Sequence, residues 1–346
     1  MDFAATGPQR IVFFCATTSG VDTVAELVRR GVRPTAIVGL ARDSADPDTV
    51  SGWIDVEDVG ARLRVPACAV RSYALKHGDD RSAIEALRPD LIVVTGWQRL
   101  VPEWLIALPE FGVIGGHGSP DGIHGGRGRS PQTWALLLGC PTFDLSLFRI
   151  APGVDDGPVL ASRTFDYRRD DDIAVSYQRA TLASADMLME LLADPTRLKG
   201  GTPQPEGGFY YPQRRPEDGW ADWTLPAERI EAHCRALTRP YPGLRSATAH
   251  GGSIRIWRCQ PFDCDTSLPP GTIGPCFESG DFLVHCTGGR LLVRDWTGPE
   301  GWTPEPGTNL QGRLWADQLR AIVERHESSY PDFPVSPRIL SEIGRG

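Results

Sequence analysis

Short apolar runs alternate with stretches of helix-like periodicity through the first half of the chain. The run at 90–95 has four apolar residues in a row at its centre, which is typical of a parallel strand buried on both faces. Strands that alternate with helices in this way predict a mostly parallel sheet with helices on both faces. The expected strands are 10–15, 35–39, 66–70, 90–95 and 112–114, and the expected helices are 21–30, 56–63, 80–87 and 102–108.

The pattern changes after residue 130. Pro131 opens a predicted helix, with Ser130 as its N-cap. The elements expected in this region are a helix at 131–138, strands at 145–150 and 164–167, and a long amphipathic helix at 172–192. The Gly- and Pro-rich segment 200–208 is then the clearest linker, so we expect a domain boundary near residue 205.

The remainder of the chain is expected to be rich in β-structure. Short β-like runs are separated there by Gly and Pro turns, which predicts a small β barrel. The expected strands are 253–258, 271–277, 281–286 and 290–295, and the expected helices are 226–237 and 314–324. We therefore predict three parts: residues 1–204, residues 205–312, and a C-terminal helix and tail at 313–346.

Composition and charge narrow the class of protein. The 346 residues are 40% hydrophobic with a formal net charge of -8, which supports a sizeable core and gives no global attraction for nucleic acid or membrane. The N-terminus lacks a signal-peptide pattern and no apolar stretch is long enough to span a membrane, so we expect a cytoplasmic protein. The eight cysteines show no zinc-ligand spacing, which predicts buried, reduced thiols and no metal site.

Two glycine-rich segments carry the candidate chemistry. His117 lies in the segment 115–119, which we expect to be a loop at the carboxyl end of a strand, where open α/β sheets bind ligands. Asp155 follows 38 residues later, within Gly-Val-Asp-Asp-Gly at 153–157. A nearby carboxylate orients an imidazole and favours its charged form, so the two form a candidate general acid/base pair, with Asp156 as the alternative carboxylate.

Anion binding is expected at two places. Thr17, Thr18 and Ser19 precede a predicted helix, whose N-terminus can hold a substrate anion, and plain N-capping is the alternative role. This turn lacks the G-x-G-x-x-G pattern, so we expect no dinucleotide there. Arg127 and Arg129 can bind a phosphate or carboxylate in bidentate fashion, with a solvated loop as the alternative.

Three segments occur in the order and at the spacing of one enzyme family. The His117 segment, the run Arg-Ser-Pro-Gln-Thr-Trp-Ala at 129–135 and the Asp155 segment together resemble the folate-dependent formyltransferases. That family includes the methionyl-tRNA, glycinamide ribonucleotide and sugar N-formyltransferases. The matching residues are His117, Ser119, Arg127, Gly128, Pro131, Trp134, Ala135 and Asp155, and residues 215–243 resemble the start of the C-terminal domain of the methionyl-tRNA enzymes.

The resemblance implies a fold, a donor and a set of site residues. The implied fold class is α/β, with a Rossmann-like, mostly parallel sheet in the N-terminal domain and a small OB-like β-barrel C-terminal domain. The implied donor is 10-formyltetrahydrofolate as co-substrate, with His117 and Asp155 as catalytic residues; Trp97 is either a stacking platform or a core residue. The implied cofactor-binding residues are Trp97, Arg99, Leu100, Val101, Ser119 and Asp156. The candidate substrate-binding residues are those expected above to bind anions, namely Thr17, Thr18, Ser19, Arg127 and Arg129.

The chain departs from the family pattern at one catalytic position. Where the family carries a catalytic Asn, this chain has Gly115, which offers no side-chain donor. Loss of one oxyanion donor typically raises a barrier by roughly 3 kcal/mol. Either another donor replaces the Asn, such as His124, Ser119, a backbone amide or a bound water, or the reaction differs.

We therefore expect an N-formyltransferase acting on the primary amine of a small molecule, such as an amino sugar or a specialised-metabolism amine. The open alternatives are methionyl-tRNA formyltransferase, a 10-formyltetrahydrofolate hydrolase, transfer of a different one-carbon or acyl group, and a non-catalytic folate sensor. Residues 205–346 contain 15 Arg and no Lys against 18 Asp and Glu, a net charge of -3, which argues against a tRNA partner. Formation of a homodimer is left open.

Overall fold

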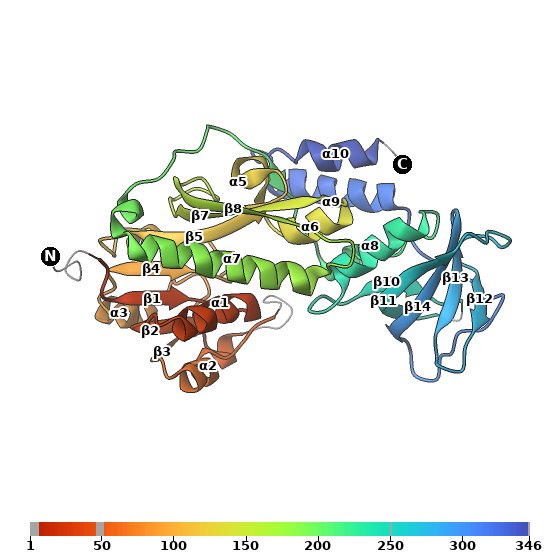
Figure 1. Ribbon diagram of the computed structural model, residues 1–346, viewed down its shortest axis with the longest axis horizontal. Helices are drawn as coiled ribbons and strands as arrows, with labels where there is room; N and C mark the ends of the chain where they lie inside the picture. The colour runs from red at the N-terminus through yellow and green to blue at the C-terminus, as the bar shows by residue number, and fades with distance from the viewer. Residues whose placement is uncertain (1–6, 46–51, 250, 345–346) are drawn as a thin grey trace. The chain divides into compact units, whose positions relative to one another are not determined.

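The computed structural model describes residues 7–45, 52–249 and 251–344 (Figure 1). By their internal contacts these residues fall into two compact units. The first unit takes the chain up to Arg127 together with 143–165 and 177–207, and the second takes 128–142, 166–176 and the chain from Gly208 onward. Two segments from the first half of the chain thus belong with its C-terminal half. The domain limits expected from the sequence stay a prediction.

The first unit is built on a seven-stranded sheet. Its strands are β1 (Ile11–Phe14), β2 (Ala36–Leu40), β3 (Ala67–Val70), β4 (Leu91–Val94), β5 (Val113–Ser119), β7 (Thr142–Arg149) and β8 (Val159–Asp166). They are ordered β3-β2-β1-β4-β5-β7-β8. The five strands from β3 to β5 are parallel, whereas β7 runs antiparallel to β5. The mostly parallel sheet expected from the sequence is confirmed.

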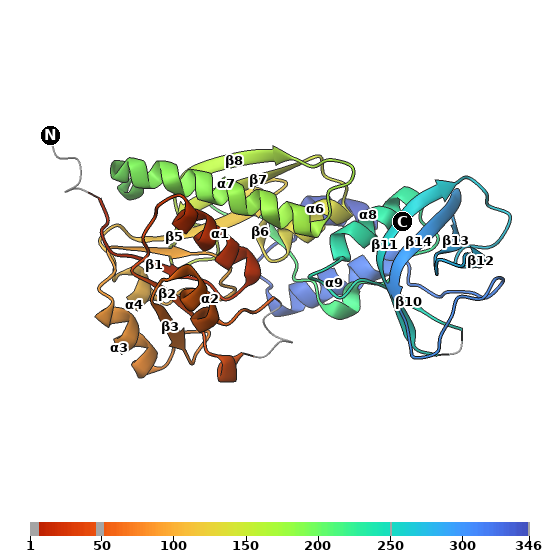
Figure 2. The same cartoon turned by 60° about the horizontal axis from the view of Figure 1, so that its bottom comes forward.

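Helices cover both faces of this sheet (Figure 2). They are α1 (Thr18–Arg29), α2 (Val56–Leu63), α3 (Gly78–Ala86), α4 (Glu103–Ile106) and most of α7 (Ile173–Ala193), with 3-10 helices at Arg42–Ser44 and Pro195–Lys199. One core joins Phe13 and Leu91 to apolar residues of α1, α2 and α7. The other joins Phe14 and Ile92 to residues of α3 and α4. Neighbouring residues of a strand point to opposite faces, so each buried strand contributes to both cores.

The His117 segment is a strand and not the expected loop. The sequence predicts a strand that ends at residue 114, but β5 continues through Ser119. Antiparallel pairing with β7 stabilises the continuation, and His117 lies opposite Ser146. A Cβ at position 118 would lie 2.3 Å from the ring of Phe143, so Gly118 permits the close approach. The prediction was wrong because glycines inside a strand resemble a loop until the partner strand is known.

Two helix N-termini also differ from expectation. Ser130 precedes α6 (Pro131–Leu137), but its side chain makes no capping hydrogen bond. Thr17 likewise stands before α1 without such a bond. Its hydroxyl donates instead to the carbonyl oxygen of Gly96 at 3.3 Å. Thr17 therefore ties the first β-to-α turn to the turn that follows β4.

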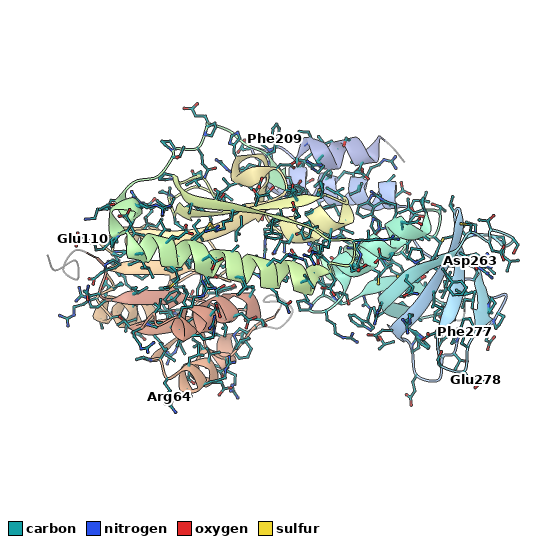
Figure 3. The ribbon with its side chains drawn as sticks, in the orientation of Figure 1. Arg64, Glu110, Phe209, Asp263, Phe277 and Glu278 are labelled. Atoms are coloured by element: carbon teal, nitrogen blue, oxygen red, sulfur yellow. The ribbon has the colours of Figure 1, made fainter. Side chains whose placement is uncertain are left out.

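The second unit contains a five-stranded antiparallel sheet. Its strands are β10 (Leu244–Ala247), β11 (Ser253–Asp263), β12 (Ile273–Cys276), β13 (Phe282–Cys286) and β14 (Gly289–Thr297), in the order β10-β11-β14-β13-β12. The expected C-terminal β domain is confirmed, although the sequence did not predict β10. The turn after β12 presents the exposed side chains of Phe277 and Glu278 (Figure 3).

Helix α8 packs against both β11 and α6 within this unit. The helices here are α6, α8 (Ala227–Leu237), α9 (Trp315–Ser329) and α10 (Pro337–Ile343), with a 3-10 helix at Pro216–Asp218. The remaining short elements of the chain are α5 (Gly122–Gly125), β6 (Arg127–Gly128) and β9 (Tyr210–Tyr211). The helix expected at 314–324 extends to Ser329, and α10 was not expected.

All eight cysteines lie among the described residues, and none forms a disulfide. Most are buried or half-buried, and burial raises the pKa of Cys15 to about 12. Cys264 and Cys276 are exposed, which corrects the expectation of uniformly buried thiols. Each lies at or just beyond the end of a strand, where the chain leaves the sheet.

The described part of the chain has neither a membrane-spanning helix nor a metal-binding cluster. No helix there is long and apolar enough to cross a membrane. In the same residues, no group of three or more His, Cys, Asp and Glu side chains is arranged to hold a metal ion.

His233 is a buried titratable residue in the second unit. It lies on α8, is 1% exposed, and its ring centroid is 4.5 Å from that of Trp315. Burial lowers the pKa of His233 well below its ordinary value of 6.5, and the charges of Arg229 and Arg214 add to the shift. The folded unit therefore keeps this imidazole neutral at a pH where the unfolded chain binds a proton.

We expect acid to destabilise the second unit through His233. As the pH falls below the unfolded-state pKa near 6.5, the unfolded chain gains a proton that the folded unit excludes. The free energy of unfolding should then fall by up to about 1.4 kcal/mol per pH unit from this group. Urea unfolding between about pH 7 and pH 5 should show a smaller loss for His233→Gln than for the wild type.

The matched control is His77→Gln, which changes an exposed histidine and should retain the wild-type pH dependence. The same pH slope in the wild type and His233→Gln would contradict the prediction.

Candidate active site

Both ring nitrogens of His117 have oxygen neighbours. Nε2 lies 2.8 Å from the carbonyl oxygen of Gly126, and Nδ1 lies 3.4 Å from Oδ2 of Asp155. A carbonyl oxygen can only accept a hydrogen bond, so Nε2 carries a proton and donates a hydrogen bond to the carbonyl oxygen of Gly126. The neutral ring therefore has its lone pair on Nδ1, facing the carboxylate.

The pair combines a buried ring with a more accessible carboxylate. The side chain of His117 is 9% exposed and that of Asp155 is 23% exposed. Pairing of β5 with β7 holds the backbone of His117, because residues 114–119 are in register with 144–149. An imidazole oriented in this way can take up and release a proton without large rearrangement. The catalytic role of the two residues stays a prediction.

Asp155 lies in a tight turn between β7 and β8 that requires glycine at residue 157. A Cβ there would lie 1.7 Å from the carbonyl oxygen of Arg149, whereas a Cβ at residue 153 would meet only the movable, exposed side chain of Asp156. Asp155 has a φ of 50°, in the left-handed region, which Asp adopts more readily than most residues. This turn brings Asp155, and not the exposed Asp156, to His117.

The side chain of Gln204 joins the Asp155 turn to Arg127. Its Nε2 donates to the carbonyl oxygens of Asp155 at 2.8 Å and Gly157 at 2.7 Å. Its Oε1 accepts from Nη2 of Arg127 at 3.1 Å. Arg127 is 5% exposed, and its Nε has no hydrogen-bond partner among the described residues. Sequence reasoning missed Gln204, because it lies in a Gly/Pro-rich segment typical of a linker.

Apolar side chains surround the position of Gly115. This residue lies on the same face of β5 as His117, two positions away. A Cβ on it would lie 3.0 Å from Cγ1 of Ile150 and 3.2 Å from Cζ of Phe148. Phe148 is also the cross-strand partner of Gly115. A side chain at residue 115 would therefore have to displace the apolar side chains of Ile150 and Phe148.

The segment after β4 contains four of the predicted cofactor-binding residues. Trp97 is 9% exposed, packs edge-on against Tyr73 at 4.7 Å and belongs to the core, yet its buried Nε1 has no partner among the described residues. The guanidinium of Arg99 lies over Tyr73 at 5.1 Å, and Leu100 is 62% exposed. Val101 is partly buried. Contacts of these residues with a cofactor stay predictions.

Ser119 and the first β-to-α turn already make hydrogen bonds within the protein. Ser119 is fully buried, and its Oγ accepts from the backbone N–H of Asp121 at 3.1 Å. Thr17 is buried, Ser19 is half-buried and Thr18 is exposed. The roles predicted for these residues, and for Asp156, stay predictions.

Arg129 and His124 lie in different units. Arg129 belongs to the second unit, where its backbone N–H donates to the carbonyl oxygen of Tyr211 at 3.2 Å. His124 lies on α5 in the first unit, and its Nδ1 is buried without a partner in the described structure. Sequence reasoning also missed the carbonyl of Gly126, since a backbone oxygen leaves no signal in the side-chain pattern.

Sequence comparison finds two family models along the chain. The model described as formyl transferase matches residues 9–192, which is more than half of the 346 residues. The model described as formyl transferase, C-terminal domain, matches residues 214–308. The methionyl-tRNA formyltransferase of Methylococcus capsulatus is 28% identical to the chain over 298 residues, which cover 82% of this chain and 90% of that protein.

Solved structures share the fold at low sequence identity. HypX from Aquifex aeolicus in complex with tetrahydrofolic acid has a TM-score of 0.60 at 17% identity, covering 94% of this chain and 58% of HypX. The N-formyltransferase from Helicobacter canadensis, in complex with folinic acid and dTDP-3-aminofucose, has a TM-score of 0.56 at 10% identity, covering 82% of this chain and 98% of that one.

Gly115→Ala should destabilise the protein, and Gly116→Ala should not. The new methyl group at 115 is forced against Ile150 and Phe148, which should lower the free energy of unfolding by about 1–3 kcal/mol. Gly116 is exposed, and a Cβ there meets only Leu147 at 3.5 Å, an ordinary contact. Urea unfolding of the two variants measures the difference. Equal stabilities would show that residue 115 has room for a side chain.

Proposed function

The chain belongs to the formyl transferase family, and we propose that it moves a formyl group from 10-formyltetrahydrofolate to the primary amine of a small molecule, such as an amino sugar. The observation that carries this proposal is the His117–Asp155 pair, in which a fixed imidazole has its lone pair beside a carboxylate. The folate compounds bound in HypX and in the Helicobacter canadensis enzyme support the donor. The nucleotide-linked aminofucose in the latter supports the class of acceptor.

His117 and Asp155 handle the proton that an attacking amine must lose. Attack by the amine on the formyl carbon leaves the amine nitrogen positively charged. Since Nε2 of His117 is already bound to Gly126, the pair takes up the proton on its Nδ1 side, where the carboxylate stabilises the imidazolium. The pair then gives the proton to the leaving nitrogen of the donor, and the bond from the formyl carbon to that nitrogen breaks as the carbonyl group re-forms.

The segment 96–101 offers a suitable place for the donor's ring system. The buried indole N–H of Trp97 has no acceptor within the described protein, so an acceptor on a ligand can satisfy it. Exposed residues such as Leu100 leave the backbone of the segment open to a ligand. We propose that these residues bind and orient the folate, while the His117–Asp155 pair moves the proton.

The negative charge that develops on the formyl oxygen needs a donor other than residue 115. Gly115 has no side-chain donor, and a Cβ there would lie 3.0 Å from Ile150 and 3.2 Å from Phe148. The segment that follows β5 contains His124, whose buried Nδ1 has no partner in the described structure. We propose that a donor from residues 119–126, with His124 as the side-chain candidate, takes the place of the family's asparagine.

Asp155→Asn and His117→Gln should each slow formyl transfer by about 100- to 10,000-fold, because each removes one half of the proton-handling pair. The measurement is amine-dependent formation of tetrahydrofolate, with formate assayed in parallel without amine. His77→Gln, at an exposed position, is the control and should match the wild type. Full activity in both site variants would contradict the mechanism. Rapid formate release without amine would support a hydrolase instead.

A second candidate acceptor is methionyl-tRNA, favoured by the named relative and by a local cluster of arginines. On β10 and β11, Arg245 lies directly opposite Arg255. The guanidinium groups of Arg245 and Arg313 lie 4.5 and 4.4 Å from the ring of Trp220. Nε of Arg245 also donates to Oγ of Ser253 at 3.3 Å, and Nη1 of Arg255 is buried without a hydrogen-bond partner among the described residues. A cluster of this kind suits phosphate groups, despite the net charge of the C-terminal half.

A triple variant, in which Arg245, Arg255 and Arg313 are all replaced by Gln, distinguishes the two acceptors. If the acceptor is a small amine, kcat/KM with a dTDP-linked amino sugar should stay within about twofold of the wild type. If the acceptor is methionyl-tRNA, kcat/KM with it should fall at least about tenfold, with a weaker salt dependence. Arg64→Gln, at an exposed position of the first unit, is the control. Activity on methionyl-tRNA alone would contradict the small-amine proposal.

A further inference from the structure

We infer that Gln204 and Arg127 are positioning residues that hold Asp155 beside His117 during formyl transfer, an inference that rests on the proposed function. The contacts form a closed cycle of five residues that begins and ends at His117. Nε2 of His117 donates to Gly126, whose neighbour in the chain, Arg127, donates to Gln204. Gln204 donates to the backbone of Asp155, and the Asp155 carboxylate faces Nδ1 of His117. All five residues belong to the first unit.

The cycle of contacts positions the two oxygen atoms beside the imidazole, which are the carbonyl oxygen of Gly126 and Oδ2 of Asp155. Gly126 directly precedes Arg127 in the chain. Asp155 lies in the turn to which Gln204 donates two hydrogen bonds. A shift of Gln204 or Arg127 therefore changes the spacing of both neighbours of His117. A displacement of about 1 Å at such a pair is enough to slow a reaction by about 100-fold.

The chemistry of a primary amide suits the place that Gln204 occupies. Two carbonyl oxygens face its Nε2, and a guanidinium N–H faces its Oε1. The position therefore needs a donor on one terminal atom and an acceptor on the other, which an amide supplies. A carboxylate at position 204 would have no donor for the carbonyl oxygens of Asp155 and Gly157. An ammonium group there would have no acceptor for the guanidinium of Arg127.

The segment that carries Gln204 is fixed to the sheet. Thr202 and Val159 exchange backbone hydrogen bonds of 2.8 Å in both directions, which extends the edge of β8. Nη2 of Arg149 donates to the carbonyl oxygen of Gly200 at 3.1 Å. Gln204 thus reaches the Asp155 turn from an anchored backbone. The left-handed conformation of Asp155 is one that needs such support to persist.

The burial of Arg127 makes the cycle of contacts rigid. The residue is 5% exposed, and its Nε is already without a hydrogen-bond partner among the described residues. Loss of the hydrogen bond from its Nη2 to Gln204 would leave a second polar atom of this buried side chain without that partner, which is unfavourable. Arg127 and Gln204 hold each other in place, and together they hold the turn.

The test compares Gln204→Glu and Gln204→Asn with the wild type. Gln204→Glu keeps the length and an acceptor for Arg127 but removes the donor, and Gln204→Asn keeps the amide but is one methylene too short. We expect kcat for formyl transfer to fall about 10- to 100-fold in both variants. KM for 10-formyltetrahydrofolate should stay within about twofold, because Gln204 acts on Asp155 and not on the substrate. Glu206→Gln, at an exposed position of the same segment, is the matched control and should equal the wild type.

A double variant tests whether Gln204 acts through Asp155. In an Asp155→Asn background, Gln204→Glu should lower kcat by less than about twofold further, because its target carboxylate is already gone. A full additional loss there would overturn the inference, and so would an unchanged kcat in the single variant. If Gln204→Glu does not fold, Gln204→Asn carries the same comparison.

Nitrogen NMR of the imidazoles provides a readout without turnover. The chain has seven histidines, and His117→Gln assigns the signal of interest. We expect the Nε2–H tautomer in the wild type and a shifted Nδ1 signal in Gln204→Glu. If the wild type does not transfer formyl groups but the signal shifts, the proposed function fails and the positioning role stands. If the wild type is active and Gln204→Glu has the same kcat and the same spectrum, the positioning role fails.

Discussion

The antiparallel pairing of β5 with β7 is the constraint on which the candidate site depends. It extends β5 to Ser119, so His117 is held by a sheet and not by a loop. The same register sets Phe148 against Gly115, which closes the space beside it. Beyond β7 the chain turns through glycines 153 and 157 and brings Asp155 to the ring. One pairing thus accounts both for the position of His117 and for the apolar side chains that crowd Gly115.

The sequence predicts the elements that depend on local pattern and misses those that depend on a partner. The apolar run at 90–95 is recognisable alone, because it is continuous and bounded by polar residues. The extension of β5 is not, because glycines form a strand only against the close surface of β7. The pairing of His117 with Asp155 was found from the motif. Gln204 was not, since its role arises from carbonyl oxygens that any sequence contains.

The net charge of the C-terminal half argues against a phosphate-bearing partner, whereas its local cluster of arginines favours one. The segment 205–346 has a net charge of -3, which describes its average field. The register of β10 and β11 nevertheless sets Arg245 opposite Arg255, and burial together with the Arg245 charge lowers the pKa of Arg255. Like charges opposed across strands are unfavourable unless an anion lies near them. The net charge alone therefore does not exclude an acceptor that carries phosphate groups.

The segment that follows α7 still belongs to the first unit, and Gln204 in it contacts the candidate site. The last strand of the first sheet closes at Asp166, and α7 closes at Ala193, so a boundary drawn from the sheet and its helices would fall before Gln204. A chain divided there would keep the sheet, His117 and Asp155, but it would lose the amide that grips the Asp155 turn. A segment that carries this candidate site into another protein therefore has to include the Gly/Pro-rich stretch as far as Gln204.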